Sequence, residues 1–292
     1  MERHNQILQD IADKIRDFYK LRQPYRVFSS STRPRHATDT NIIDISMLSQ
    51  VISVDSAQRN CLVEPNVPMD RLVEATMPFG IIPPVVMEFP GITAGGGFAG
   101  TSGESSSFRH GFFNETVNSV EMILGNGDTI RASREEHEDL FHEAKQFVKT
   151  TYHRVGNVSA AISTTKKCCE NVDVDYVHEI WPLWLCPLKG CRTPTFHPVT
   201  KGSSDTGTGD NMSQPMLNIG VWGWGPLDPE EFKTKNEALE KKLMELGGRK
   251  WLYAHTYYTE EQFRELNDRC WYQELRERYF ANRLRQGEKE WP

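Results

Sequence analysis

The feature that most constrains this chain is a glycine- and serine-rich segment at residues 90–111, PGITAGGGFAGTSGESSSFRHG. Seven of the 21 glycines lie in it, and it follows neither the period of a helix nor the alternation of a strand. We therefore expect an irregular loop. Where side chains are this small, backbone N–H groups can approach an anion closely, and neighbouring hydroxyls add donors. A flexible surface loop is the alternative.

Two nucleotide-binding motifs can be compared with this segment. Residues Gly95 to Gly100 formally match G-x-G-x-x-G, in which a strand leads into a helix whose amino terminus holds a pyrophosphate. No periodic helix begins here, so we do not expect a nicotinamide-type Rossmann site. A P-loop is excluded because no Gly-Lys-Ser/Thr follows. The donors nevertheless suit a dinucleotide pyrophosphate.

Hydrophobic periodicity divides the rest of the chain into two parts. The first part is strand-rich, with an amphipathic helix at 5–21 packing on the body, short strands over 25–63, a helix at 68–80, a strand-like 81–86, a hairpin around Asn126-Gly127 and a helix at 135–145. The second part alternates strands at 147–153, 176–185, 216–224 and 251–258 with helices at 158–170, 229–246 and 260–280. An α+β fold with two subdomains follows.

Composition excludes several classes of protein. The chain of 292 residues is 38% hydrophobic and 25% charged, as in globular proteins, and its net charge of −6 with no basic block argues against nucleic acid as a partner. No apolar run reaches the length of a membrane span, and the charged amino terminus is no signal peptide. Six cysteines without metal-ligand spacing predict reduced thiols and no metal site in a cytoplasmic protein.

The segment and its flanks resemble a known family. The pattern PGIT-GGG-AGTSGESSS-HGFF, within residues 63–133, is similar to the PCMH-type FAD-binding domain of the vanillyl-alcohol oxidase superfamily, and within it to the Δ24-sterol reductases. The later blocks HEIWPLWLCPLKG, NIGVWGWGP and KWLYAHTYYTEEQF resemble the carboxy-terminal part of those reductases. The resemblance implies an amino-terminal helix at 1–24, a shortened FAD-binding domain at 25–153 and a smaller α/β substrate or cap remnant at 154–292.

The resemblance also implies a function. It predicts an FAD-dependent oxidoreductase acting on CH–CH bonds, which reduces or forms a carbon–carbon double bond of a small hydrophobic substrate, a sterol or terpenoid-like molecule, with NADPH as candidate electron donor. FAD would be noncovalent, because no His or Cys stands where some relatives attach it. The family's cofactor contacts map onto Gly95, Gly96, Gly97, Gly100, Thr101, Ser102, Gly103, Glu104, Ser105, Ser106, Ser107 and Gly111. No catalytic residue is assigned, and the cytosolic face of the endoplasmic reticulum is the expected location if the protein associates with a membrane.

The chain departs from the family in ways that leave a second hypothesis open. After Asp139-Leu140-Phe141 the family continues with a glycine-rich segment that is absent here, and most of its cap domain is missing near residues 156–159. Losing a strand and a wall of the site weakens cofactor retention. The alternative is therefore a non-redox protein that binds or cyclises a natural product, or an inactive pseudoenzyme. Oligomeric state stays undetermined by the sequence.

Overall fold

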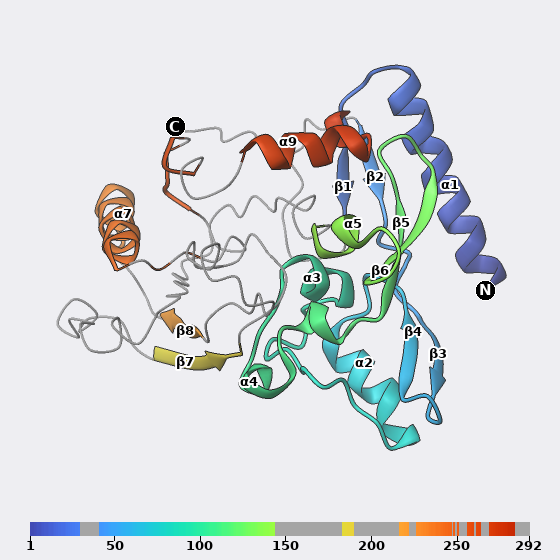
Figure 1. The fold of residues 1–292 in the computed structure, drawn as a ribbon, viewed down its shortest axis with the longest axis horizontal. Coiled ribbons are helices and arrows are strands. Elements are labelled where there is room, and N and C mark those ends of the chain that lie inside the picture. Colours follow the sequence, from blue (N-terminus) through green and yellow to red (C-terminus); the bar gives the residue numbers. More distant parts are fainter. Residues whose placement is uncertain are drawn as a thin grey trace, which may run out of the picture. The chain divides into compact units, whose positions relative to one another are not determined.

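The computed structural model describes residues 1–29, 41–143, 183–189, 216–221, 226–246, 248, 250, 256–259, 261–263 and 269–283 (Figure 1). Helices and two-stranded sheets make up these regions, which confirms the α+β class. The chain divides into two compact units. Unit 1 comprises Met1–Ser102, Phe113–Lys149 and Arg269–Pro292, and unit 2 comprises Gly103–Phe112 and Thr150–Asp268.

This division differs from the expected boundary at residue 153 in two segments. The carboxy-terminal segment Arg269–Pro292 belongs to unit 1, because Leu275 is buried in the same hydrophobic cluster as Phe141. The short segment Gly103–Phe112 belongs to unit 2, where the Leu188 side chain lies beside it. The functional domain boundaries at residues 24 and 153 stay a prediction.

Unit 1 begins with helix α1 (Glu2–Lys20), close to the predicted bounds. Its apolar stripe packs on the parallel pair β1 (Arg26–Phe28) and β2 (Ile42–Asp44). The buried residues of this cluster are Ile11, Ile15, Tyr25, Ile43 and Leu48. The predicted packing of the first helix on the body is therefore confirmed.

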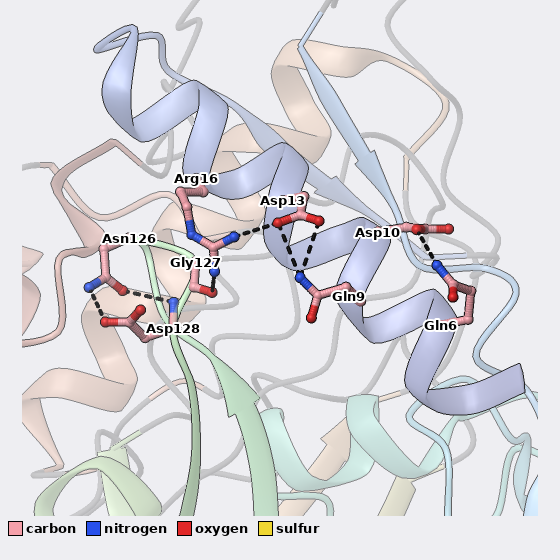
Figure 2. A network of polar contacts seen from close by, with 8 residues as sticks. All are labelled: Gln6, Gln9, Asp10, Asp13, Arg16, Asn126, Gly127 and Asp128. Carbon is pink, nitrogen blue, oxygen red and sulfur yellow. Dashed lines mark hydrogen bonds and ion pairs between the residues drawn. The ribbon is translucent and has the colours of Figure 1, made fainter. Parts of the chain in front are cut away.

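Polar contacts on α1 attach this helix to a second part of unit 1 (Figure 2). Gln9 donates to Asp13 one turn later, and Asp13 forms an ion pair with Arg16. The Arg16 guanidinium also donates to the backbone oxygen of Gly127 at 3.0 Å. Because Gly127 belongs to the turn of the β5–β6 hairpin, formed by Ser119–Ile123 and Thr129–Ser133, one arginine joins α1 to that hairpin.

The β5–β6 pair confirms the predicted hairpin, but its turn differs from the two-residue type. A type I′ turn needs a positive φ at both central residues, and in this turn only Gly127 has one, at 87°. The Gly127 N–H donates to the oxygen of Leu124, and the Leu124 N–H donates to the oxygen of Asp128. These bonds are typical of a three-residue loop in which the glycine forms a bulge.

The antiparallel strands β3 (Val51–Asp55) and β4 (Asn60–Val63) are followed by helix α2 (Met69–Thr76). A 3₁₀ turn then ends at Gly80, whose φ of 71° suits a helix terminus, so the predicted helix is confirmed. The strand expected at 81–86 is wrong: these residues are irregular. Two consecutive prolines remove the N–H groups that a strand ladder needs, although Val85 is fully buried.

The carboxy-terminal helix completes the core of unit 1 (Figure 1). Helix α5 (Glu138–Glu143) carries Asp139, which accepts a hydrogen bond from the Tyr279 hydroxyl at 2.5 Å and forms an ion pair with Arg278. Tyr279 directly follows helix α9 (Arg269–Arg278) and lies in the core cluster. Burial, reinforced by the Asp139 carboxylate, raises the pKa of Tyr279 far above its usual value.

Unit 2 contains the antiparallel strands β7 (Leu183–Leu188) and β8 (Met216–Val221) and helix α7 (Pro229–Glu245). Asp228 caps α7 by accepting the N–H of Glu231. The predicted strand at 216–224 and helix at 229–246 are confirmed within the described residues.

Other predictions for the second half meet the structure only in part. Residues 256–258, expected as a strand, are irregular, so that expectation is wrong for the described end of the segment. The helix at 260–280 is present at 261–263 and in α9. The predictions for 147–153, 158–170 and 176–182 lie outside the described residues, and the end of the strand predicted at 176–185 belongs to β7. No helix among those described has the length and apolar character needed to cross a membrane.

Candidate functional site

The glycine-rich segment contains two short helices, which corrects the expectation of an irregular loop. Helix α3 (Ala94–Ala99) begins after Thr93, whose hydroxyl accepts the N–H of Gly96 at 3.2 Å. The Ala94 N–H donates to the oxygen of Val67, which anchors the first turn. Helix α4 (Ser107–His110) follows in unit 2. A threonine cap and tertiary contacts thus form a helix that glycine propensity alone opposes.

The glycines of α3 allow close packing within unit 1. A Cβ on Gly95 would lie 2.7 Å from Cβ of Pro65, and one on Gly97 would lie 2.5 Å from Cε of Met87. Real Cβ atoms do not approach other atoms so closely, so only glycine fits without a shift. The residue type at both positions is therefore explained by contacts inside the protein.

The backbone N–H groups of this first half have acceptors within unit 1. These pairs are Gly95 to Pro65 O, Gly96 to Thr93 Oγ1, Gly97 to Thr93 O, Gly100 to Gly96 O, Thr101 to Phe98 O and Ser102 to Gly97 O. Thr101 is fully buried and has a φ of 46°, an unusual conformation for a β-branched residue. Such strain persists where surrounding structure enforces it and is found at functional sites.

In unit 2 the second half of the segment turns around Glu104, which is 5% exposed. Its carboxylate accepts the hydroxyl of Ser105 at 2.8 Å, the N–H of Ser106 at 2.9 Å and the hydroxyl of Ser106. Its own N–H donates to the Ser107 hydroxyl, and its carbonyl accepts the N–H of Ser107. The serine hydroxyls expected to face a phosphate are thus directed at a carboxylate.

The same turn leaves two backbone donors without an internal acceptor. Among the described residues, the N–H groups of Gly103 and Ser105 have no hydrogen-bond partner, whereas those of the three other residues of 103–107 are bonded within the turn. Unpaired N–H groups on a tight turn are the chemistry that binds phosphate oxygens. The fit to an FAD pyrophosphate therefore rests in unit 2 on this pair of amides rather than on the hydroxyls. Gly111 ends α4 with a φ of 78°.

Ionisable groups near the turn are exposed. Arg109 and His110 are both solvent-exposed, and no ion pair joins Arg109 to Glu104. His153 lies outside the described residues. Within the parts of the chain that are described, no three His, Cys, Asp or Glu side chains gather as a metal site would require. Of the cysteines, Cys168, Cys169 and Cys191 fall outside those parts.

Two residues that shape the segment are not among the predicted site residues. Thr93 precedes the first helical residue, which is the ordinary position of an N-cap, so its role could have been found had a helix been considered. Cys186 is fully buried on β7, and its thiol donates to the carbonyl of Glu104 at 2.8 Å. Nothing local predicts a contact between residues 82 positions apart.

The unpaired amides of Gly103 and Ser105 are compatible with an anion site. Comparison with known families shows which kind of domain the segment resembles. Residues 7–133 match the family described as FAD binding domain. The resemblance to a PCMH-type FAD-binding domain that the sequence shows is therefore confirmed over these residues.

Particular relatives are similar over part of the chain. Δ24-sterol reductase of Pisum sativum is 33% identical over 101 residues, covering 34% of this chain and 18% of that protein. The Rattus norvegicus enzyme of the same name is 30% identical over 148 residues, covering 48% of this chain and 28% of that protein. The chain thus aligns with less than a third of either relative. Among solved structures, 6-hydroxy-D-nicotine oxidase of Arthrobacter nicotinovorans matches 78% of this chain and 51% of its own, with 17% identity and a TM-score of 0.42.

Proposed function

We propose that the protein is an FAD-dependent oxidoreductase that acts on a carbon–carbon double bond of a small hydrophobic substrate, a sterol or terpenoid-like molecule. The observation that carries the proposal is the FAD binding domain match over residues 7–133, which includes the whole glycine-rich segment. The names of the pea and rat relatives support the substrate class.

The chain's own residues would bind and orient the cofactor. The unpaired N–H groups of Gly103 and Ser105 would donate to the pyrophosphate. FAD would be held noncovalently. When bound it supplies hydride transfer, so that the alkene, NADPH and one proton become the saturated product and NADP⁺. The protein would work in the cytoplasm or at the cytosolic face of the endoplasmic reticulum.

One observation favours the alternative of a non-redox binding protein or pseudoenzyme. Six N–H groups between Gly95 and Ser102 already have acceptors inside the protein, and a buried carboxylate takes the hydroxyls of Ser105 and Ser106. These groups would not add donors to a flavin site in the arrangement described.

A flavin titration decides between the two. The absorbance spectrum of the purified protein is recorded before and after FAD is added and unbound FAD is removed by gel filtration, and heat release then shows whether the flavin is free. We expect about one noncovalent FAD per chain, followed by NADPH oxidation that depends on a sterol with a side-chain double bond. A folded protein that stays colourless would overturn the reductase proposal and favour the non-redox alternative.

A further inference from the structure

We propose that Glu104 and Cys186 are positioning residues, which fix the turn at 103–107 so that the amides of Gly103 and Ser105 stay unpaired and available as anion donors. This inference rests on the proposed function for the identity of the anion, an FAD pyrophosphate. Neither residue touches the cofactor in this scheme, so Glu104, predicted from the resemblance as a cofactor contact, acts instead through its neighbours.

The first step of the argument is that Glu104 uses every polar group it has inside unit 2. Its N–H, its carbonyl and both carboxylate oxygens are hydrogen-bonded. Within the turn, the partners are Ser105, Ser106 and Ser107. A buried carboxylate without its donors is strongly unfavourable. The carboxylate therefore holds the serine hydroxyls and the Ser106 amide inward.

The second step is that these hydrogen bonds occupy some amides of the turn and leave others unpaired. The N–H groups of Glu104, Ser106 and Ser107 are consumed by the turn, and those of Gly103 and Ser105 are not. A carboxylate that instead faced the same anion as these amides would repel it, because like charges at contact distance cost energy even in a partly solvated site. Turning the carboxylate inward removes that conflict.

The third step is the support from β7. The Cys186 thiol is fully buried and donates to the Glu104 carbonyl, the same oxygen that accepts the N–H of Ser107. Gly103 lies so close to Phe112 and Leu188 that a Cβ there would be 3.1 Å and 3.3 Å from their side chains. Strand β7, which is more than 70 residues away in sequence, thus holds the turn through Cys186 and Leu188.

Four variants test the inference: Cys186→Ala removes the donor, Cys186→Ser keeps one, Glu104→Gln keeps the side-chain shape, and Cys270→Ala is the control. Cys270 is an exposed free thiol on α9 and does not belong to the turn. The 2.8 Å separation leaves a serine hydroxyl within reach of the Glu104 carbonyl. Glu104→Gln covers the case in which Cys186→Ala does not fold. It replaces one carboxylate oxygen by an NH₂ group that cannot accept, so at least one of the bonds donated by Ser105 and Ser106 is lost or reversed.

The primary readout is amide hydrogen exchange of the peptide covering 103–112, measured without added FAD, and the second is FAD affinity by absorbance titration. Cys186→Ala and Glu104→Gln should each speed exchange and weaken FAD binding about three- to tenfold, the loss of about one hydrogen bond, and Cys186→Ser should restore both values. The control should match the wild type.

Unchanged exchange in both Cys186→Ala and Glu104→Gln would overturn the positioning role, as would equal losses in the Ser and Ala variants of Cys186. Failure of the wild-type protein to bind FAD would overturn the proposed function instead, while the exchange measurement would still decide whether these residues fix the turn.

Discussion

Replacing Gly95 by alanine separates a packing role of the glycine run from a role in cofactor approach. The new Cβ would lie 2.7 Å from Cβ and 3.0 Å from the carbonyl oxygen of Pro65. Neither atom belongs to a flexible side chain, so the helix or the preceding segment must move. Alanine gains about 0.5–1 kcal/mol over glycine within a helix, and overpacking costs about 1–3 kcal/mol. We expect a net loss of about 1–2 kcal/mol in the free energy of unfolding.

Gly97→Ala should be less harmful, although its Cβ would be as crowded. The nearest atoms belong to the end of the Met87 side chain, with Phe113 at 3.1 Å. A methionine adapts to its surroundings by rotating about three bonds, whereas a proline ring and a backbone carbonyl do not. Gly91→Ala is the matched control, because nothing lies within 4 Å of a Cβ at that position.

The assay is urea unfolding of each variant without added FAD, followed by FAD titration of the folded protein. The packing argument predicts that stability falls in the order Gly91→Ala, Gly97→Ala, Gly95→Ala, with the control within about 0.5 kcal/mol of the wild type. A Gly95→Ala protein with unchanged stability but weakened FAD binding would refute it, since the glycine would then serve the ligand rather than the fold.

Two further predictions concern buried and partly buried charges. Burial alone would raise the pKa of Asp139, but hydrogen bonds from Tyr279, a backbone N–H and Arg278 lower this pKa overall. The ionised Asp139 therefore stabilises the folded state above the pKa of about 3.9 that it has in the unfolded chain, and this stabilisation disappears as the pH falls through the folded-state pKa. Asp139→Asn should therefore lower the thermal midpoint at pH 6–7 and lose this deficit below about pH 4; a deficit independent of pH would contradict the assignment. Lys250 forms a buried ion pair with Glu240, and burial lowers the pKa of Lys250. Lys250→Met should cost about 3–5 kcal/mol in urea unfolding, because the buried Glu240 carboxylate loses its cation and keeps only hydrogen bonds such as that from the Tyr257 N–H. Adding Glu240→Gln should recover part of the loss.

Local signals predicted the elements whose formation depends on their own residues. The apolar stripes of α1 and α7 and the turn glycine Gly127 act within a few positions of the element they define. The failures have long-range causes. Residues 81–86 have the composition of a strand, yet they cannot form a ladder through two prolines and are retained in the core by Val85. The placement of α9 in unit 1 depends on Asp139, which is separated from Tyr279 by 140 positions.

The candidate site shows the same limit in its chemistry. A glycine- and serine-rich sequence identifies backbone and hydroxyl groups that are able to bind an anion, but it does not say which of them the fold has already used. In unit 1 the amides of Gly95 to Ser102 are bonded internally, and in unit 2 Glu104 takes the hydroxyls of two serines. The donors that remain, on Gly103 and Ser105, lie on either side of Glu104, whose own N–H is bonded to the Ser107 hydroxyl. A family motif of this kind is therefore better interpreted as a scaffold that leaves a few amides free than as a row of equivalent ligand contacts.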